Sequence, residues 1–229
     1  QALVKKGQAF EQAAAAAAKA MQNPELQRYA LELFEALFEK GYKQTLDKAT
    51  VAAAESMKDP KLQKYALELF QALVKKGQAF EQAAAAAAEG MEKPGLQWYA
   101  LELFKALFAE RYEPAFEQAI TAATLGVQLP DKKPVLDLLR AIVDANKAYT
   151  KKANDVVRLI IQSSNISSDD KEEAKGLQRY CIERAKEGYP SETAKAKAKA
   201  KAAAPPHAVE VGAAGAGGKA PVPIAVGAD

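Results

Sequence analysis

Few residues in this chain of 229 could do acid, base or nucleophilic chemistry. The one histidine is His207, in a stretch rich in alanine, lysine and proline, and the one cysteine is Cys181. A nucleophilic thiol or hydroxyl needs a base beside it, and zinc sites are built mainly from histidine and cysteine. The glycines after Gly212 follow no strand and form no phosphate loop. We therefore predict no enzymatic activity, no cofactor and no metal site.

Carboxylates recur at one position of a repeated motif, at Glu32, Glu68 and Glu102. General acid or base catalysis requires a cleft and a shifted pKa, and a sequence shows neither. Because the three glutamates belong to a repeated polar face, we interpret them as solvated.

A second recurrent position could bind a protein. After each Leu-Gln pair the sequence has Arg28, Lys64 and Trp98, with Arg179 at the corresponding place further on. Stacked repeats would align these four residues as a basic and aromatic ridge, and exposed tryptophan is a frequent anchor at interfaces. We predict that they bind a protein or peptide partner; the alternative is that they are solvated helix residues.

Four lysines alternate with alanine near the C-terminus, at Lys195, Lys197, Lys199 and Lys201. This pattern resembles the lysine-alanine tails of histone-like proteins. Mobile charges of this kind give weak, salt-sensitive binding to nucleic acid that does not depend on sequence. Nucleic-acid association through these lysines is the alternative function, and a solubilising tail is the other interpretation.

The elements that would position these residues come from a tandem duplication. Residues 1–18 recur without change as residues 71–88, and the string L-Q-x-Y-A-L-E-L-F begins at Leu26, Leu62 and Leu96. A fixed period is the signature of a repeat architecture. The spacing of about 35 residues predicts one helical hairpin per unit.

The first helix of a unit has apolar residues at a helical period. Glycines at positions 7, 41 and 77 are predicted to end the copies of this helix. The second helix is rich in alanine, and we interpret it as the inner, tightly packed layer, with Phe80 and Met91 as anchors. Slippage of an alanine-coding repeat would also explain residues 13–18 and 83–88. Prolines break this helix at four places, and Asn23 and Asp59 suit the N-cap of the next helix.

One hairpin cannot fold alone. Burying a large apolar side chain contributes about 1.5 to 3 kcal/mol, whereas ordering some 34 residues costs on the order of 50 kcal/mol. The sequence therefore predicts an all-α, right-handed α-solenoid in which neighbouring hairpins cover one another. Residues 1–130 hold the hairpin repeats, the first of them truncated because the chain opens inside a copy of the first helix.

Residues 131–190 are predicted to form helices that cap the array. Apolar residues follow a helical period over 131–163, as one long helix or as two broken near Asn146. Asp169 and Glu172 have the spacing of a capping box, and Gly188, Tyr189 and Pro190 are predicted to end the last helix. That helix contains Cys181 among apolar neighbours, which indicates a buried, inert thiol. Residues 191–229 have no apolar stripe and are predicted to be disordered.

Composition limits the partners and the compartment. The net charge of +3, from 32 basic and 29 acidic residues, is too small to predict a polyanion partner for the helical part. A single cysteine excludes an internal disulfide and fits a reducing compartment, and no apolar run is long enough to cross a membrane. We expect a cytoplasmic protein.

Over residues 1–130 the units resemble the helical-hairpin repeat superfamily, both HEAT-like and tetratricopeptide-like. The string D-P-K-L-Q-K-Y-A-L-E-L-F from Asp59 looks like the first helix of a HEAT repeat. The interval from Gly77 to Pro94 is similar to the glycine-to-proline distance of a tetratricopeptide unit. The resemblance implies a curved scaffold that binds proteins or peptides on one surface, without catalysis.

Overall fold

The computed structural model describes residues 2–41 and 43–186. These residues form helices and no strands. The helices are α1 (Ala2–Met21), α2 (Gln27–Glu39), α3 (Lys43–Ser56), α4 (Gln63–Lys75), α5 (Phe80–Met91), α6 (Gln97–Ala109), α7 (Glu113–Gly126), α8 (Lys133–Ala145), a 3₁₀ turn η1 (Lys147–Tyr149), α9 (Thr150–Gln162) and α10 (Ser168–Lys186). The predicted disorder of 191–229, and the predicted helix end at Gly188, Tyr189 and Pro190, lie outside the described residues.

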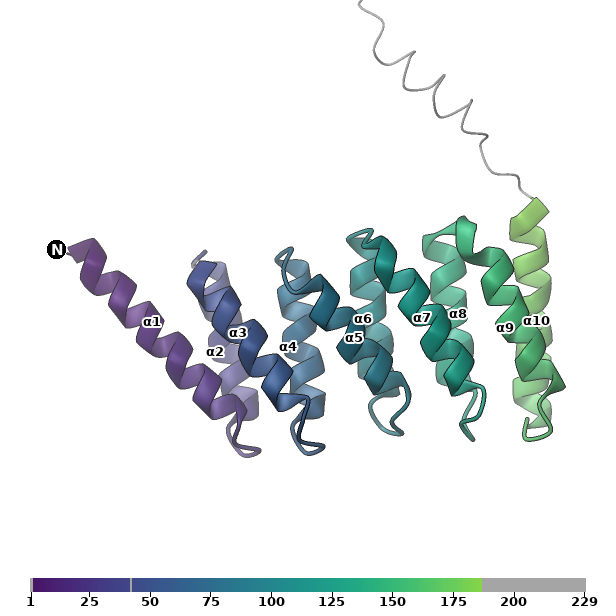
Figure 1. The fold of residues 1–229 in the computed structure, drawn as a ribbon, viewed down its shortest axis with the longest axis horizontal. Coiled ribbons are helices and arrows are strands. Elements are labelled where there is room, and N and C mark those ends of the chain that lie inside the picture. Colours follow the sequence, from purple (N-terminus) through teal and green to yellow (C-terminus); the bar gives the residue numbers. More distant parts are fainter. Residues whose placement is uncertain (1, 42, 187–229) are drawn as a thin grey trace, which may run out of the picture. The chain divides into compact units, whose positions relative to one another are not determined.

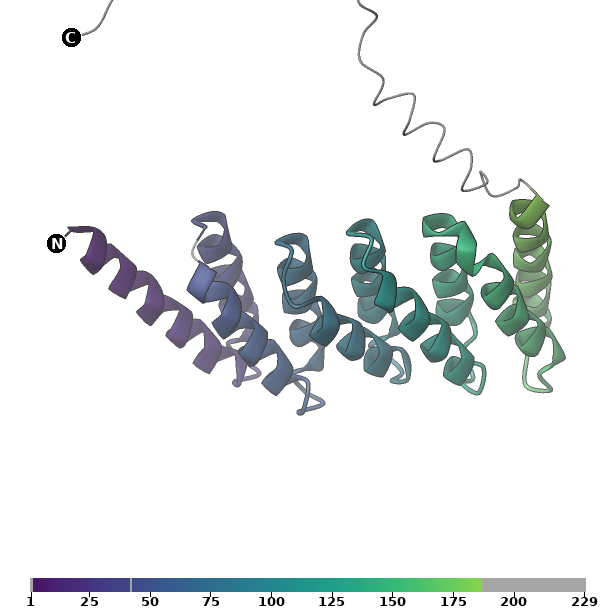
Figure 2. The same ribbon diagram turned by 45° about the horizontal axis from the view of Figure 1, so that its top comes forward.

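The helices form two layers (Figure 1). The odd-numbered helices make one layer and the even-numbered helices make the other, as the turned view also shows (Figure 2). Each helix contacts its hairpin partner and the corresponding helix of the next hairpin. The prediction of an all-α solenoid of helical hairpins is confirmed.

The core consists of the same apolar positions in successive hairpins. Phe34, Phe70 and Phe104 occupy one repeated position on α2, α4 and α6, and each is at most 1% exposed. Each hairpin covers apolar side chains of its neighbour. This is required because a single hairpin buries too little apolar surface to offset the cost of ordering its residues.

The alanine-rich layer is tightly packed, as predicted. Buried alanines line α3, α5 and α7, and the last turns of these helices carry Ser56, Gly90 and Gly126 at one repeated position. A Cβ added at Gly90 would lie 3.0 Å from the Cβ of Ala100, and one added at Gly126 would lie 2.6 Å from Cγ2 of Val135. Small residues are needed here because the end of each odd helix approaches an even helix too closely for a larger side chain.

A buried glutamine begins three helices of the even layer. Its side-chain amide donates to a carbonyl at the end of the preceding odd helix, where the helix itself leaves carbonyls without partners. The pairs are Gln27 with Met21 (3.1 Å), Gln63 with Met57 (2.7 Å) and Gln97 with Met91 (3.3 Å). Gln27 also donates to the carbonyl of Leu62 in the next unit, at 3.2 Å.

In the fourth unit, Lys132 replaces the glutamine as the donor to carbonyls at the end of the preceding odd helix. It replaces the leucine that precedes the glutamine in the earlier units, and its side chain is fully buried. Its Nζ donates to the carbonyl of Val127 at 2.6 Å and to that of Leu129. A different residue at a neighbouring position thus satisfies the end of α7.

The predicted stop at Gly7 is wrong, because α1 runs through it without interruption. The identical residues at 71–88 instead turn at Gly77, whose φ is +75°. There α4 is anchored by the fully buried Leu73 and Val74, and the amide of Gly77 donates to the carbonyl of Val74 at 2.8 Å. At Gly7 the backbone instead stays helical, and the alanine-rich residues that follow favour the continuation of α1.

Helix starts differ from the predicted caps. The side-chain oxygens of Asn23 and Asp59 accept from the amides two residues further on, at 3.0 and 2.9 Å, as a capping residue does. Their carbonyls also accept from the amides of Leu26 and Leu62 in tight turns, and α2 and α4 begin only after these turns. Asparagine or aspartate followed by proline suits the first two positions of a type I turn.

The last helices, α8 to α10, show where the chain breaks near Asn146 and which residues cap the start of α10. The chain breaks at Asn146 between α8 and η1, which confirms two helices in place of one. The cap lies two residues earlier than predicted, at Ser167 and Asp170, because α10 already begins at Ser168. Asp169 is therefore inside the helix.

Exchanging Gly126 for alanine tests the close approach of α7 to α8. We expect Gly126→Ala to lower the free energy of unfolding by about 1 to 2 kcal/mol, because the new methyl group meets the stiff, buried Val135. Gly176→Ala is the matched control: nothing lies within 4 Å of its added Cβ, so it should raise the free energy of unfolding by up to about 1 kcal/mol. Equal effects in urea unfolding would contradict this assignment.

Lys132→Met tests whether the buried amine holds the end of α7. The methionine fills similar space but leaves the carbonyl of Val127 without a donor, so we expect a loss of about 1 to 3 kcal/mol in unfolding free energy. Lys133→Met, next in the chain and exposed, should change it by less than about 0.5 kcal/mol. Comparable losses in both variants would show that the hydrogen bonds of Lys132 are unimportant.

Candidate protein-binding surface

Three of the four predicted binding residues stand at equivalent places. Arg28, Lys64 and Trp98 are the second residues of α2, α4 and α6, which are neighbours in the even layer. Arg179 is exposed in the second half of the longer α10, and α8 lies between α6 and α10 in the layer. The structure therefore brings the first three residues to one end of adjacent helices and places the fourth apart from them.

Lys64 is engaged within the repeat array. Its Nζ lies 5.1 Å from the ring centre of Tyr65 and 5.2 Å from that of Tyr99 on the next even helix. Contact with Tyr99 raises the pKa of the Lys64 amine. Arg28 forms an ion pair with Glu32 at 3.1 Å on its own helix. Both basic residues thus have partners inside the chain.

Trp98 is the aromatic member of the set, and it is exposed. Its side chain is 64% exposed, and its ring meets Tyr99 edge-on with 5.0 Å between ring centres. An edge-to-face pair fixes the orientation of the indole while most of its surface stays open to solvent. Trp98 is therefore a rigid apolar feature on the outside of the even layer.

A cavity of about 290 Å³ lies beside Trp98, between α2, α4 and α6. We call it the tryptophan cleft. Its walls are Leu31 and Glu35 from α2, Leu67, Glu68, Gln71, Ala72 and Lys75 from α4, and Trp98, Tyr99 and Glu102 from α6. Three helices of the repeat must stack to create this surface.

The tryptophan cleft has an excess of negative charge. Glu102 pairs with Lys105 at 2.8 Å, whereas Glu35 and Glu68 form no ion pair with a described residue. Burial raises the pKa of Glu68, and the nearby Glu35 adds to the rise, while Lys64 opposes it. Of the three repeated glutamates that we interpret as solvated, Glu32 is exposed, whereas Glu68 and Glu102 are half-buried in the cleft.

Sequence reasoning missed Glu35 and Tyr99 as parts of this surface. The signal was present in the comparison of the units, since the position of Glu35 holds Gln71 in the next unit and Lys105 in the one after. A position whose charge changes from unit to unit lies outside the core, because packing in the core would limit its residue type. Tyr99 gave no such signal because the tyrosine is repeated.

Cys181 is buried, as predicted. It is a free thiol, 1% exposed, and burial together with the charge of Asp144 raises its pKa to about 11. Within residues 2–41 and 43–186, no cluster of acidic, histidine and cysteine side chains could hold a metal ion. None of the described helices is long and apolar enough to cross a membrane.

Comparison with known proteins assigns no family to the chain. No family model matches it, and no curated protein matches it. Among solved structures it is similar to a chain described as "DHF119 filament", with 23% identity over 82% of this chain and 81% of that one, and a TM-score of 0.20. The class of protein follows from the contacts described above: this is a tandem helical-repeat protein.

The thiol of Cys181 should react only when the protein unfolds. A protonated, buried thiol is a poor nucleophile, so we expect less than about a hundredth of the labelling rate of free cysteine at pH 7.5 in a thiol-exchange assay. Rapid labelling of the native protein would show that the helices around Cys181 open readily. Labelling in urea should follow the unfolding curve.

Proposed function

We propose that the chain is a non-enzymatic scaffold that binds a protein or peptide through the tryptophan cleft. The observation that supports this function is the exposed, rigidly oriented Trp98 beside a cavity formed by three stacked helices. Buried tryptophan anchors contribute most strongly to binding at the centre of protein interfaces. The resemblance of the units to HEAT-like and tetratricopeptide-like repeats agrees with such a role.

The charges of the cleft indicate what the partner presents. Glu35 and Glu68 face a cavity that contains one cation, Lys75. A lysine or arginine side chain of the partner would meet these carboxylates and also lie against the face of Trp98. We therefore propose that the partner places a basic residue in the cleft, next to apolar side chains that cover the indole.

The lysines of the alternative function remain a prediction. Lys195, Lys197, Lys199 and Lys201 lie outside the described residues, so no structural observation supports nucleic-acid binding. A mobility-shift experiment with and without residues 191–229, at low and moderate salt, tests that alternative separately.

Selection from displayed random peptides against the full chain tests the proposed site. We expect enriched peptides to contain lysine or arginine beside an apolar residue. Trp98→Ala should weaken the binding of a selected synthetic peptide by about 2 kcal/mol or more, roughly thirtyfold in affinity, as measured by a fluorescence-anisotropy titration. Glu68→Gln should weaken it by about 1 kcal/mol.

Glu32→Gln is the matched control, because it removes the same charge at the same repeated position outside the cleft and should leave affinity unchanged. Affinity should also fall on acidification, since protonated Glu68 no longer attracts a cation. The fall should begin above the usual glutamate pKa of about 4.3, because burial raises the pKa of Glu68. Peptides that bind Trp98→Ala as well as the native chain would refute the site.

A further inference from the structure

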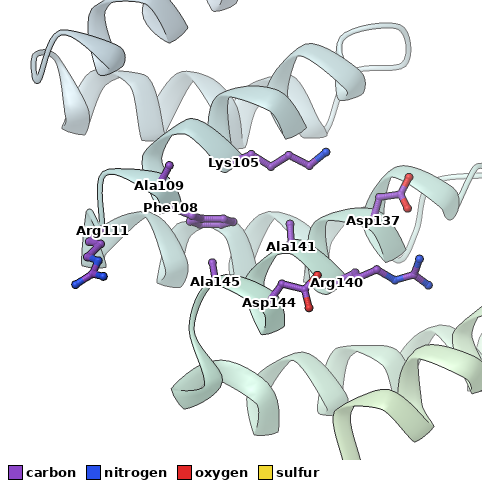
Figure 3. Close-up of a pocket in the computed structure, with 9 residues that line it drawn as sticks. All are labelled: Lys105, Phe108, Ala109, Arg111, Asp137, Arg140, Ala141, Asp144 and Ala145. Carbon is purple, nitrogen blue, oxygen red and sulfur yellow. The ribbon is translucent and has the colours of Figure 1, made fainter. Parts of the chain in front are cut away.

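A second cavity, of about 690 Å³, lies between α6 and α8 and shares no residue with the tryptophan cleft. We call it the α6–α8 groove. Arg111 lies at one end, Asp137 and Arg140 lie at the other, and Phe108 and Ala141 lie between them (Figure 3). The groove thus has charged ends and an apolar middle.

Phe108 gives the groove a rigid floor. Its ring stacks on Phe104, with 5.9 Å between ring centres, and on Phe116 at 4.4 Å. Phe116 in turn stacks on Tyr149 at 5.0 Å. Because these aromatic contacts join α6, α7 and η1, the floor is held by neighbouring units and is already formed without a ligand.

Arg111 has an unusual backbone for its residue type. Its φ is +57°, and it stands where the earlier units have Gly41 (φ +74°) and Gly77 (φ +75°). Glycine adopts this left-handed conformation freely, whereas a side chain with a Cβ is strained there. The chain therefore keeps an arginine at a position where its own repeat uses glycine, and that arginine lines a cavity.

The carboxylates of the α6–α8 groove already have partners, one through a hydrogen bond and one through an ion pair. Asp144 accepts a hydrogen bond from the hydroxyl of Tyr180 at 2.5 Å, and Asp137 lies 3.9 Å from the amine of Lys133. Arg111 forms no ion pair with a described residue. The charge left without a partner in the groove is positive.

We propose that the α6–α8 groove binds a second peptide segment, one that carries aspartate or glutamate. Its carboxylate pairs with the guanidinium of Arg111, and an adjacent apolar side chain packs on Phe108 and Ala141. Arginine suits this task because its planar fork holds a carboxylate with two parallel hydrogen bonds. The inference does not depend on the tryptophan cleft, which attracts the opposite charge.

The test uses the same displayed peptides. The target of the selection is the full chain with the substitution Trp98→Ala, so that peptides cannot bind through the tryptophan cleft. We expect enrichment of acidic peptides with a neighbouring apolar residue. In anisotropy titrations, Arg111→Gly and Arg111→Ala should each lower the affinity for a selected peptide at least about tenfold. Lys58→Ala, which removes an exposed charge elsewhere, should have no effect.

Thermal unfolding separates binding from folding. Arg111→Gly should raise the melting temperature, because glycine relieves the strain at φ +57°, whereas Arg111→Ala retains the strain and should not. A variant that is more stable but binds less cannot have lost the peptide through misfolding. Absence of acidic peptides after selection, or equal affinity of Arg111→Gly and the native chain, would overturn the proposal. If no basic peptide binds at Trp98, the proposed function is refuted, but the proposal for the α6–α8 groove is not affected.

Discussion

The structure depends on each hairpin being covered by its neighbours. Corresponding leucines show this directly: Leu69 and Leu103 are 0% exposed, whereas Leu33, at the same repeated position on α2, is 37% exposed. The residue type and the helix position are the same, and the difference is that α2 has no earlier even helix beside it in the described part of the chain. Burial is therefore a property of the stack and not of the single helix.

Close stacking brings the polar ends of helices into the interior, where backbone carbonyls need donors. The repeat meets this need with a buried glutamine at the start of α2, α4 and α6, and in the fourth unit with Lys132. The two solutions use different residues at neighbouring positions, yet both donate to the end of the preceding odd helix. The requirement is conserved between units although the residue is not.

The surfaces proposed to bind partners are the places where the units differ. Trp98 replaces a basic residue, Glu35 becomes glutamine and then lysine, and Arg111 replaces glycine. Positions that face the core stay apolar because packing limits them, whereas outer positions can change without loss of the fold. The same stack can therefore present an acidic aromatic cleft between α2 and α6 and a groove with an unpaired cation between α6 and α8.

The sequence alone determined the helical period, the hairpin unit and the buried state of Cys181, because these follow from apolar spacing along one helix. Only the tertiary structure decided how residues 1–18 and 71–88 fold, since the same letters form one continuous helix in the first case and a helix, a turn and a helix in the second. It also decided that Lys64 is held between Tyr65 and Tyr99 while Trp98 stays exposed. Side-chain contacts between helices depend on which neighbour is present, and local sequence carries no record of that neighbour.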